Sequence, residues 1–166
     1  MIRLAIVTLS DSRSKGKLLD ESGDAIAQYA PRLGAEVVLR EILPDDYDAL
    51  VERLRALSTE VDLVLTTGGT GVGPRDVTPD ATLAVIEKEL PGFGEIMRVR
   101  TFERTPRSVL SRATAGVAGR CLIVNLPGSP RGVREGLELL CEAIRHGVEV
   151  ARGEARECAP KEEPHG

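Results

Sequence analysis

The chain is 166 residues long and carries a formal net charge of −4 at pH 7, with 42% hydrophobic and 29% charged residues. This balance is typical of a single soluble globular domain, and it excludes a disordered chain and the overall basic charge that nucleic-acid binding needs. Aromatic residues make up only 2% of the chain, which argues against stacking on single-stranded nucleic acid. Since no apolar run could span a bilayer and the first residues lack the features of a signal peptide, we expect a cytoplasmic protein that does not contact membranes.

Short apolar runs alternate with amphipathic stretches in the first half of the chain. The apolar runs predict strands over residues 2–9, 36–43 and 61–67. Helices are expected to begin at Ser22, at Asp45 or Asp46, and at Thr78, because each of these side chains can serve as an N-cap. The third of these helices is predicted to continue to Leu90.

The second half of the chain has a weaker pattern at first. Short helices are predicted around Phe93 and Val109, and the small residues at 111–119 are interpreted as a surface excursion or an oligomer contact. A fourth strand is predicted over residues 121–126. It is followed by a long amphipathic helix with Ser129 as its cap.

The end of the chain differs in composition from the rest. Residues 154–166 carry several charges and almost no apolar side chain, so we predict a mobile tail. The alternation of strands and helices before it predicts one α/β domain over residues 1–153. We expect a mostly parallel sheet with helices on both faces, joined by right-handed crossovers.

A glycine-rich stretch, LVLTTGGTGVGPRDVTPD, spans residues 63–80 and begins in the third predicted strand. A strand, a glycine loop and a helix in this order are typical of phosphate binding, because glycine lets several backbone N–H groups face one anion. The stretch lacks the Gly-Lys-Ser/Thr of a P-loop, and Pro74 stands where a dinucleotide motif needs its third glycine. A tight strand-to-helix turn is the alternative, but so many glycines and threonines together favour a ligand role.

Polar side chains follow each predicted strand, and ligands of open α/β folds bind outside the carboxyl ends of the strands. Asp45 and Asp76 follow the second and third strands and could together hold a hydrated Mg²⁺ beside bound phosphates. This pair predicts phosphoryl or nucleotidyl transfer. The alternatives are a helix cap for Asp45, a turn role for Asp11, and an ion pair of Asp76 with Arg75 or another arginine.

Four segments are specific in their combined order. They are TTGGTGVGPRDVTPDAT at 66–82, PGFGE at 91–95, LSR at 110–112 and NLPGSP at 125–130. Together they resemble the molybdopterin adenylyltransferase family, the MogA/MoaB-type proteins of molybdenum cofactor biosynthesis. The resemblance implies a three-layer α/β sandwich that forms a homotrimer, with a hexamer as the alternative, and that acts with other proteins of the same pathway. It also implies transfer of AMP from Mg²⁺-bound ATP to the terminal phosphate of molybdopterin, with release of pyrophosphate.

The resemblance implies roles for individual residues. Asp45 and Asp76 would be the catalytic residues and would place Mg²⁺ and the nucleotide. The implied substrate-binding residues are Ser10, Asp11, Ser12, Arg13, Thr67, Gly68, Gly69, Thr70, Gly71, Asp80, Asn125, Pro127, Gly128 and Ser129. Two alternatives stay open at this point. One is another enzyme of the same fold, such as a molybdenum-inserting or CinA-like protein, and the other is a molybdopterin-binding scaffold that lacks transfer.

Overall fold

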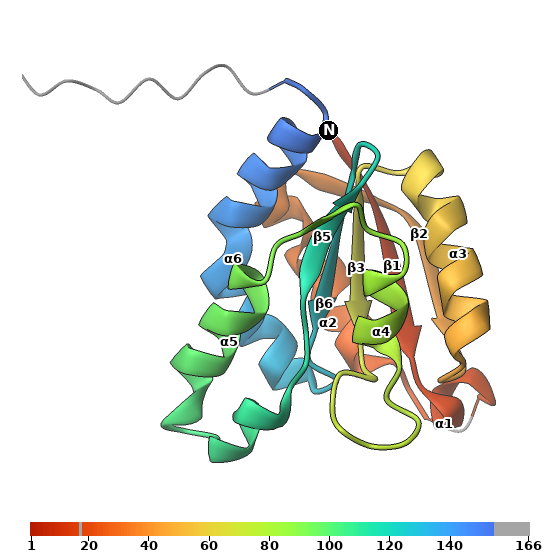
Figure 1. Ribbon diagram of the computed structural model, residues 1–166, viewed down its shortest axis with the longest axis vertical. Helices are drawn as coiled ribbons and strands as arrows, with labels where there is room; N and C mark the ends of the chain where they lie inside the picture. The colour runs from red at the N-terminus through yellow and green to blue at the C-terminus, as the bar shows by residue number, and fades with distance from the viewer. Residues whose placement is uncertain (17, 155–166) are drawn as a thin grey trace, which may run out of the picture.

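The computed structural model describes residues 1–16 and 18–154. These form a six-stranded sheet in the order β2-β1-β3-β6-β5-β4 (Figure 1). The strands are β1 (Ile2–Leu9), β2 (Ala35–Leu43), β3 (Leu63–Thr67), β4 (Lys88–Glu89), β5 (Ala115–Ala118) and β6 (Cys121–Leu126). Strands β2, β1, β3 and β6 are parallel, and β5 is antiparallel to both of its neighbours. The predicted mostly parallel sheet is therefore confirmed.

Helices cover both faces of this sheet (Figure 1). They are α1 (Asp11–Ser14), α2 (Glu21–Tyr29), α3 (Tyr47–Glu60), α4 (Thr78–Leu83), α5 (Gly92–Phe102) and α6 (Pro130–Ala151), with the 3₁₀ helices η1 (Ala30–Leu33) and η2 (Pro106–Leu110). Helices α2, α5 and α6 pack on the face that presents Leu4 and Leu65. Helices α3 and α4 pack on the opposite face, against Ala5 and Val64. Because successive strand residues point to opposite faces, the central strands are buried on both sides, and the three-layer prediction is confirmed.

Side-chain caps mark the start of four helices, three of which, α2, α3 and α6, were predicted from the sequence. Of the two predicted candidates Asp45 and Asp46, it is Asp46 that caps α3, and Ser129 caps α6 as predicted. Helix α2 is capped by Asp20, so the predicted cap Ser22 is wrong. Ser22 is instead buried in the first turn of α2, where its hydroxyl donates to the backbone carbonyl of Gly128 at 2.7 Å.

Two predicted segments differ from the structure. Helix α4 ends at Leu83, although the sequence predicts a helix that continues to Leu90. The chain instead turns into β4, and the Leu90 N–H donates to the carbonyl of Ala115 at 2.7 Å. Residues 111–119, interpreted as a surface excursion, contain the internal strand β5. Gly116 has to be small because a Cβ there would overlap the backbone of β4. Such small residues lack the β-branched and aromatic side chains by which a strand is usually predicted.

The remaining predictions concern the weaker segments and the tail. The helices predicted around Phe93 and Val109 are present as α5 and η2. The predicted tail over 154–166 lies outside the described residues except for Glu154, whose N–H donates to the carbonyl of Glu149 at 2.9 Å. Within the described ranges, no helix is both long and apolar enough to cross a membrane.

Strand register brings the loops after four strands to one edge of the sheet. Thr8 of β1 lies beside Thr67 of β3, and Thr67 lies beside Leu126 of β6. Leu9 at the end of β1 pairs with Leu43 at the end of β2. The polar segments that follow these strands therefore open at the same edge, where the candidate site lies.

Candidate functional site

The glycine loop after β3 turns sharply at Gly68 and Gly69. Both residues have positive φ angles, 93° and 67°, which favour glycine. A Cβ on Gly68 would also overlap the carbonyl oxygen of Leu9, so close packing adds a second requirement for glycine. Thr78, the predicted cap of α4, lies inside the helix, and its buried hydroxyl donates to the carbonyl of Gly68 at 2.8 Å. The loop is therefore tied back onto the start of α4.

A reciprocal pair of hydrogen bonds joins the loops after β1 and β2. The Asp11 N–H donates to the Asp45 carboxylate at 3.1 Å, and the Asp45 N–H donates to the Asp11 carboxylate at 3.0 Å. Since Asp46 caps α3, the Asp45 carboxylate has no capping role, and it lies against Gly69. Arg75, from the glycine loop, donates to Asp11 through Nε at 3.0 Å and Nη2 at 2.9 Å. Three loops thus meet around two carboxylates.

The surroundings of Asp45 favour a cation. Burial raises the pKa of Asp45, and the negative charges of Asp11 and Asp76 raise it further. In contrast, the hydrogen bonds from Arg75 lower the pKa of Asp11. Among residues 1–16 and 18–154, no three His, Cys, Asp or Glu side chains form a cluster that could hold a metal ion. The carboxylates of Asp45 and Asp76 are the ligand type that Mg²⁺ takes, one or two at a time, together with waters and phosphate oxygens.

Asp76 lies within the curve of the glycine loop. Its carboxylate accepts from the N–H of Gly73 at 2.9 Å, which closes the turn. The ion pair with Arg75 considered from the sequence is not formed, because Arg75 pairs with Asp11. The backbone carbonyl of Asp76 accepts from Arg112 at 2.7 Å. The loop therefore holds Asp76 by its backbone and by one hydrogen bond to its carboxylate.

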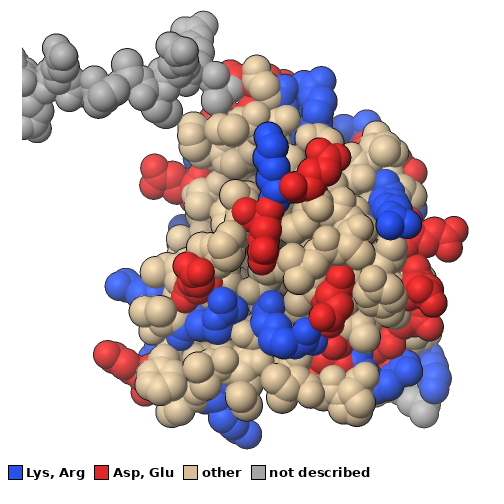
Figure 2. All heavy atoms as spheres, in the orientation of Figure 1, with Lys and Arg blue, Asp and Glu red and all other residues tan. Residues whose placement is uncertain are grey.

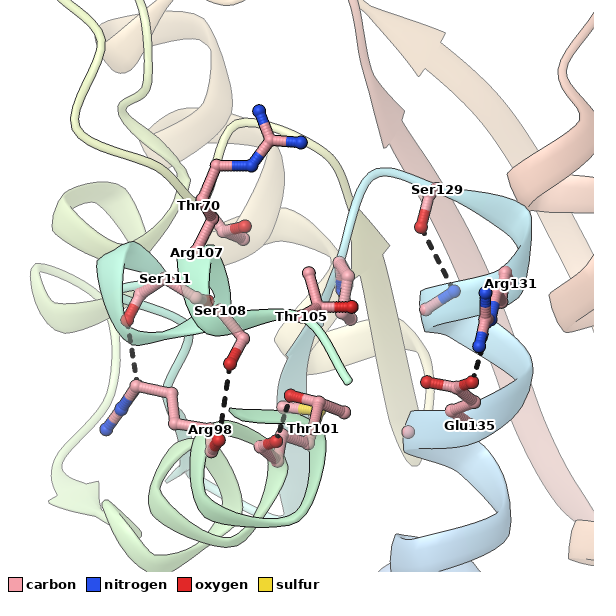
Figure 3. Close-up of a pocket in the computed structure, with 14 residues that line it drawn as sticks. Thr70, Arg98, Thr101, Thr105, Arg107, Ser108, Ser111, Ser129, Arg131 and Glu135 are labelled. Atoms are coloured by element: carbon pink, nitrogen blue, oxygen red, sulfur yellow. Dashed lines mark hydrogen bonds and ion pairs between the residues drawn. The ribbon is translucent and has the colours of Figure 1, made fainter. Parts of the chain in front are cut away.

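A pocket of about 350 Å³ lies beside the glycine loop, between α5, η2 and the start of α6 (Figure 3). Three residues predicted from the sequence line it, namely Thr70, Pro127 and Ser129. Sequence reasoning did not assign the other lining residues to the site, and these are Met97, Arg98, Thr101, Thr105, Arg107, Ser108, Ser111, Arg131, Gly132, Glu135 and Gly136. The PGFGE and LSR segments, which flank α5 and η2, were the available signal for this wall.

The pocket combines hydroxyl groups and guanidinium groups with the apolar side chain of Met97. Arg131 donates to the Glu135 carboxylate at 3.0 Å, and Arg98 donates to the backbone carbonyl of Ser111 at 3.1 Å. Dashed lines mark both contacts in Figure 3. Such a lining suits a polar ligand that carries a phosphate, because guanidinium groups bind phosphate oxygens. Figure 2 shows acidic and basic side chains interspersed on the visible face, without a broad basic field for a polyanion.

Two predicted site residues hold the loops together from inside. The Thr67 hydroxyl is buried and donates to the carbonyl of Pro127 at 2.6 Å. The Asn125 side chain is 0% exposed, and its amide nitrogen donates to the hydroxyls of Thr66 and Thr82 at 3.0 Å and 2.9 Å. The structure therefore places Asn125 as the link between β3, α4 and β6, and its enclosed side chain does not line the pocket.

Other predicted residues have partners within the protein. The Asp80 carboxylate accepts from Nη1 of Arg112 at 2.9 Å and 3.0 Å. Ser10 caps α1 by accepting from the N–H of Arg13 at 3.2 Å. The Arg13 guanidinium donates to the carbonyl of Leu19 at 2.9 Å and lines a separate hollow beside β2. Arg13 therefore lies apart from the pocket.

The structure thus brings most predicted residues into two adjoining groups. The first consists of Asp11, Asp45 and Asp76 around residues 68–71, and the second is the pocket. Thr70 belongs to both, because it continues the glycine loop and lines the pocket. Gly128 closes the junction, since a Cβ there would lie 3.3 Å from the Cα of Gly68. Ser12, in contrast, is exposed on α1.

Comparisons with known proteins agree with this geometry. A family described as a probable molybdopterin binding domain matches residues 5–146. The molybdopterin adenylyltransferase of Helicobacter pylori (strain ATCC 700392 / 26695) is 41% identical over 156 residues, covering 92% of this chain and 89% of the relative. The protein of the same name from Escherichia coli K12 is 39% identical, covering 89% of this chain and 80% of the relative. The solved structure of the molybdopterin biosynthesis enzyme MoaB from Thermus thermophilus has a TM-score of 0.86 and 40% identity, covering 95% of this chain and 100% of that one.

Proposed function

This chain belongs to the family of molybdopterin binding domains, and from that premise we propose that it is a molybdopterin adenylyltransferase of molybdenum cofactor biosynthesis. Its substrates are molybdopterin and ATP, and its products are adenylyl-molybdopterin and pyrophosphate. One observation carries the proposal. The pocket meets the glycine loop at Thr70, and the carboxylates of Asp45 and Asp76 lie against the same loop. A phosphorylated pterin in the pocket and a nucleotide on the loop can therefore meet there.

The pocket is the proposed site of molybdopterin. Its hydroxyl groups, such as those of Thr101 and Ser108, can bond the polar edge of a pterin ring. The guanidinium groups of Arg107 and Arg131 supply the positive charge that a phosphate needs. The first turn of α6 lies at the same wall, and the positive end of its helix dipole favours a bound anion.

The glycine loop is the proposed site of the ATP phosphates. Gly68 and Gly69 carry no side chains of their own, so the backbone of this turn can approach an anion closely. Asp45 and Asp76 would hold the Mg²⁺, since carboxylate oxygens are its preferred protein ligands. When bound, this ion neutralises negative charge on the phosphate oxygens.

The reaction transfers an adenylyl group between two phosphate oxygens. An oxygen of the terminal phosphate of molybdopterin attacks the α-phosphorus of ATP, and a new P–O bond forms. The bond from the α-phosphorus to the bridging oxygen breaks, and its electron pair leaves with pyrophosphate. The attacking phosphate is already an anion, so no strong general base is required. The protein contributes by holding both substrates in line through the pocket and the loop.

We also propose the domain extent, the cellular location and the assembly of the protein from its family. Residues 1–153 form one domain, and the protein is a cytoplasmic homotrimer, or a hexamer, that acts with other proteins of cofactor biosynthesis. Apolar side chains on α5 and η2 support a contact between copies, since Val99 is 69%, Val109 59% and Phe102 48% exposed. Light scattering should give a mass of three or six chains of 17.8 kDa. A monomer at micromolar concentration would contradict this assembly.

The activity is tested by incubating the purified protein with molybdopterin, ATP and Mg²⁺ and separating the pterins by chromatography. We expect adenylyl-molybdopterin only when both ATP and Mg²⁺ are present, and its loss on chelation of the metal. If molybdopterin remains bound to the protein but no adenylylated product forms, the protein is a catalytically silent scaffold of the same fold and the proposal is wrong.

A further inference from the structure

Arg112 stands between η2 and β5, in the LSR segment, where the proposed function gives it no role. Its Nε donates to the carbonyl of Gly71 at 2.8 Å, and its Nη2 donates to the carbonyl of Asp76 at 2.7 Å. Its Nη1 donates to both carboxylate oxygens of Asp80, at 2.9 Å and 3.0 Å. The backbone N–H of Arg112 donates to the carbonyl of Thr70 at 2.7 Å. One residue therefore contacts the glycine loop at both of its ends.

The segment between these contacts has little packing of its own. Val72, near the tip, is 66% exposed, and the residues on either side of it are glycines. Glycine has more accessible backbone conformations than other residues, so the tip loses much entropy when it is ordered. The Arg112 guanidinium bonds to Gly71, where the chain enters this tip, and to Asp76, where the chain leaves it. These two bonds limit the movement of Asp76.

Arg112 holds Asp76 through the backbone and forms no ion pair with its carboxylate. The guanidinium binds the backbone carbonyl of Asp76, whereas its ion pair is with the carboxylate of Asp80. Asp80 therefore balances the charge of Arg112. The Asp76 carboxylate instead accepts from the N–H of Gly73, on the far side of the loop tip.

We propose that Arg112 is a positioning residue for adenylyl transfer. It holds the two ends of the glycine loop, so that the Asp76 carboxylate and the Thr70 wall of the pocket keep a fixed separation. This inference rests on the proposed function. Lysine cannot replace Arg112, because an ammonium group lacks the planar fork that reaches three acceptors at once.

The kinetic test compares Arg112→Lys and Arg112→Gln with the matched control Arg32→Gln. Arg32 forms an exposed pair with Glu138 at 2.8 Å and lies on η1, outside the site. We expect kcat for adenylyl transfer to fall on the order of 10²-fold in both Arg112 variants, with little change in KM, because misplaced groups slow the chemical step. The control should keep the wild-type kcat. Wild-type kcat in Arg112→Lys would overturn the inference, since charge at this position would then be sufficient.

A fluorescence test follows the loop without turnover. The chain contains no tryptophan, so Val72→Trp places a single indole at the exposed tip. We expect time-resolved anisotropy to show faster local motion of this indole when Arg112→Lys is added, and no change when Arg32→Gln is added. Arg112→Lys keeps the positive charge beside Asp80, so it remains informative if Arg112→Gln does not fold.

The two tests separate failure of the inference from failure of the proposed function. If the wild-type protein makes no adenylyl-molybdopterin, the proposed function is wrong, and the inference that rests on it falls as well. If the wild type is active and Arg112→Lys changes neither kcat nor the motion of the indole, only the inference is wrong. Faster motion together with a lower kcat would support both.

Discussion

Asp45 and Asp46 are neighbours in the chain, yet the fold gives their carboxylates different roles. Asp46 accepts from the N–H of Ala49 at 2.8 Å and caps α3. Asp45 lies against the glycine loop, where burial and the charges of Asp11 and Asp76 raise its pKa. A raised pKa means that the ionised carboxylate is less stable in the folded protein than in the unfolded chain. A carboxylate that lowers stability where it stands is typical of a functional site.

The substitution Asp45→Asn should separate activity from stability. We expect adenylyl transfer to fall roughly 10²-fold or more, because the charge that places the nucleotide is lost. The melting temperature at neutral pH should be unchanged or higher, since the amide removes an ionised group whose folded-state pKa is raised. This stabilisation should disappear below about pH 4, where the carboxyl of the wild type is protonated in both states.

Asp46→Asn is the matched control for this prediction. The chemical change is identical and only one position away, and asparagine caps helices as well as aspartate does. Both activity and melting temperature should therefore stay at wild-type values. Equal losses of activity in the two variants would show that Asp45 has no special role.

At the scale of elements, the unit formed by β3, the glycine loop and α4 is the one on which the site depends. Gly68 is enclosed on one side by the carbonyl of Leu9, and its own carbonyl accepts from Thr78. Gly119, between β5 and β6, also has a positive φ angle, 60°, but a Cβ there would meet open space. The two glycines thus differ in packing while sharing an unusual backbone conformation.

This contrast predicts different effects of alanine at the two positions. Gly119→Ala should destabilise the protein by about 1 kcal/mol, from backbone strain alone. Gly68→Ala should cost at least ~2 kcal/mol more and should reduce adenylyl transfer, because the loop must move away from β1. Denaturant unfolding of both variants measures the difference. Equal stabilities would mean that the close approach of Gly68 to Leu9 does not constrain the loop.

The elements that could be predicted from the sequence are those with a strong local signal. The long apolar runs of β1 and β6 and the capped amphipathic helix α6 are predictable because burial and capping leave a clear pattern. Strand β5 escapes prediction because it is short and built from small residues that fit against β4. The end of α4 could not be predicted either, because the chain leaves the helix to pair with β5, and this pairing is a long-range contact.

At the scale of the whole molecule, the position of the site was predictable and its walls were not. Parallel strands place their carboxyl ends at one edge, so Asp45 and Asp76 could be expected near each other from the order of elements. The PGFGE and LSR segments mark α5 and η2, but no local pattern shows that these elements meet α6 in space to form the pocket. The ion pair of Arg75 with Asp11 likewise spans 64 positions, so sequence spacing could not reveal it.

The most direct test of this account follows the phosphorus atoms of ATP. The protein is incubated with molybdopterin, Mg²⁺ and ATP labelled at either the α- or the γ-phosphorus, alongside the variants Asp76→Asn and Asp45→Asn. The account predicts that the α label appears in the pterin product, that the γ label appears in pyrophosphate, and that both variants fold but transfer little label. Transfer of the γ label to the pterin, absence of α-label transfer by the wild type, or wild-type transfer by Asp76→Asn would contradict it.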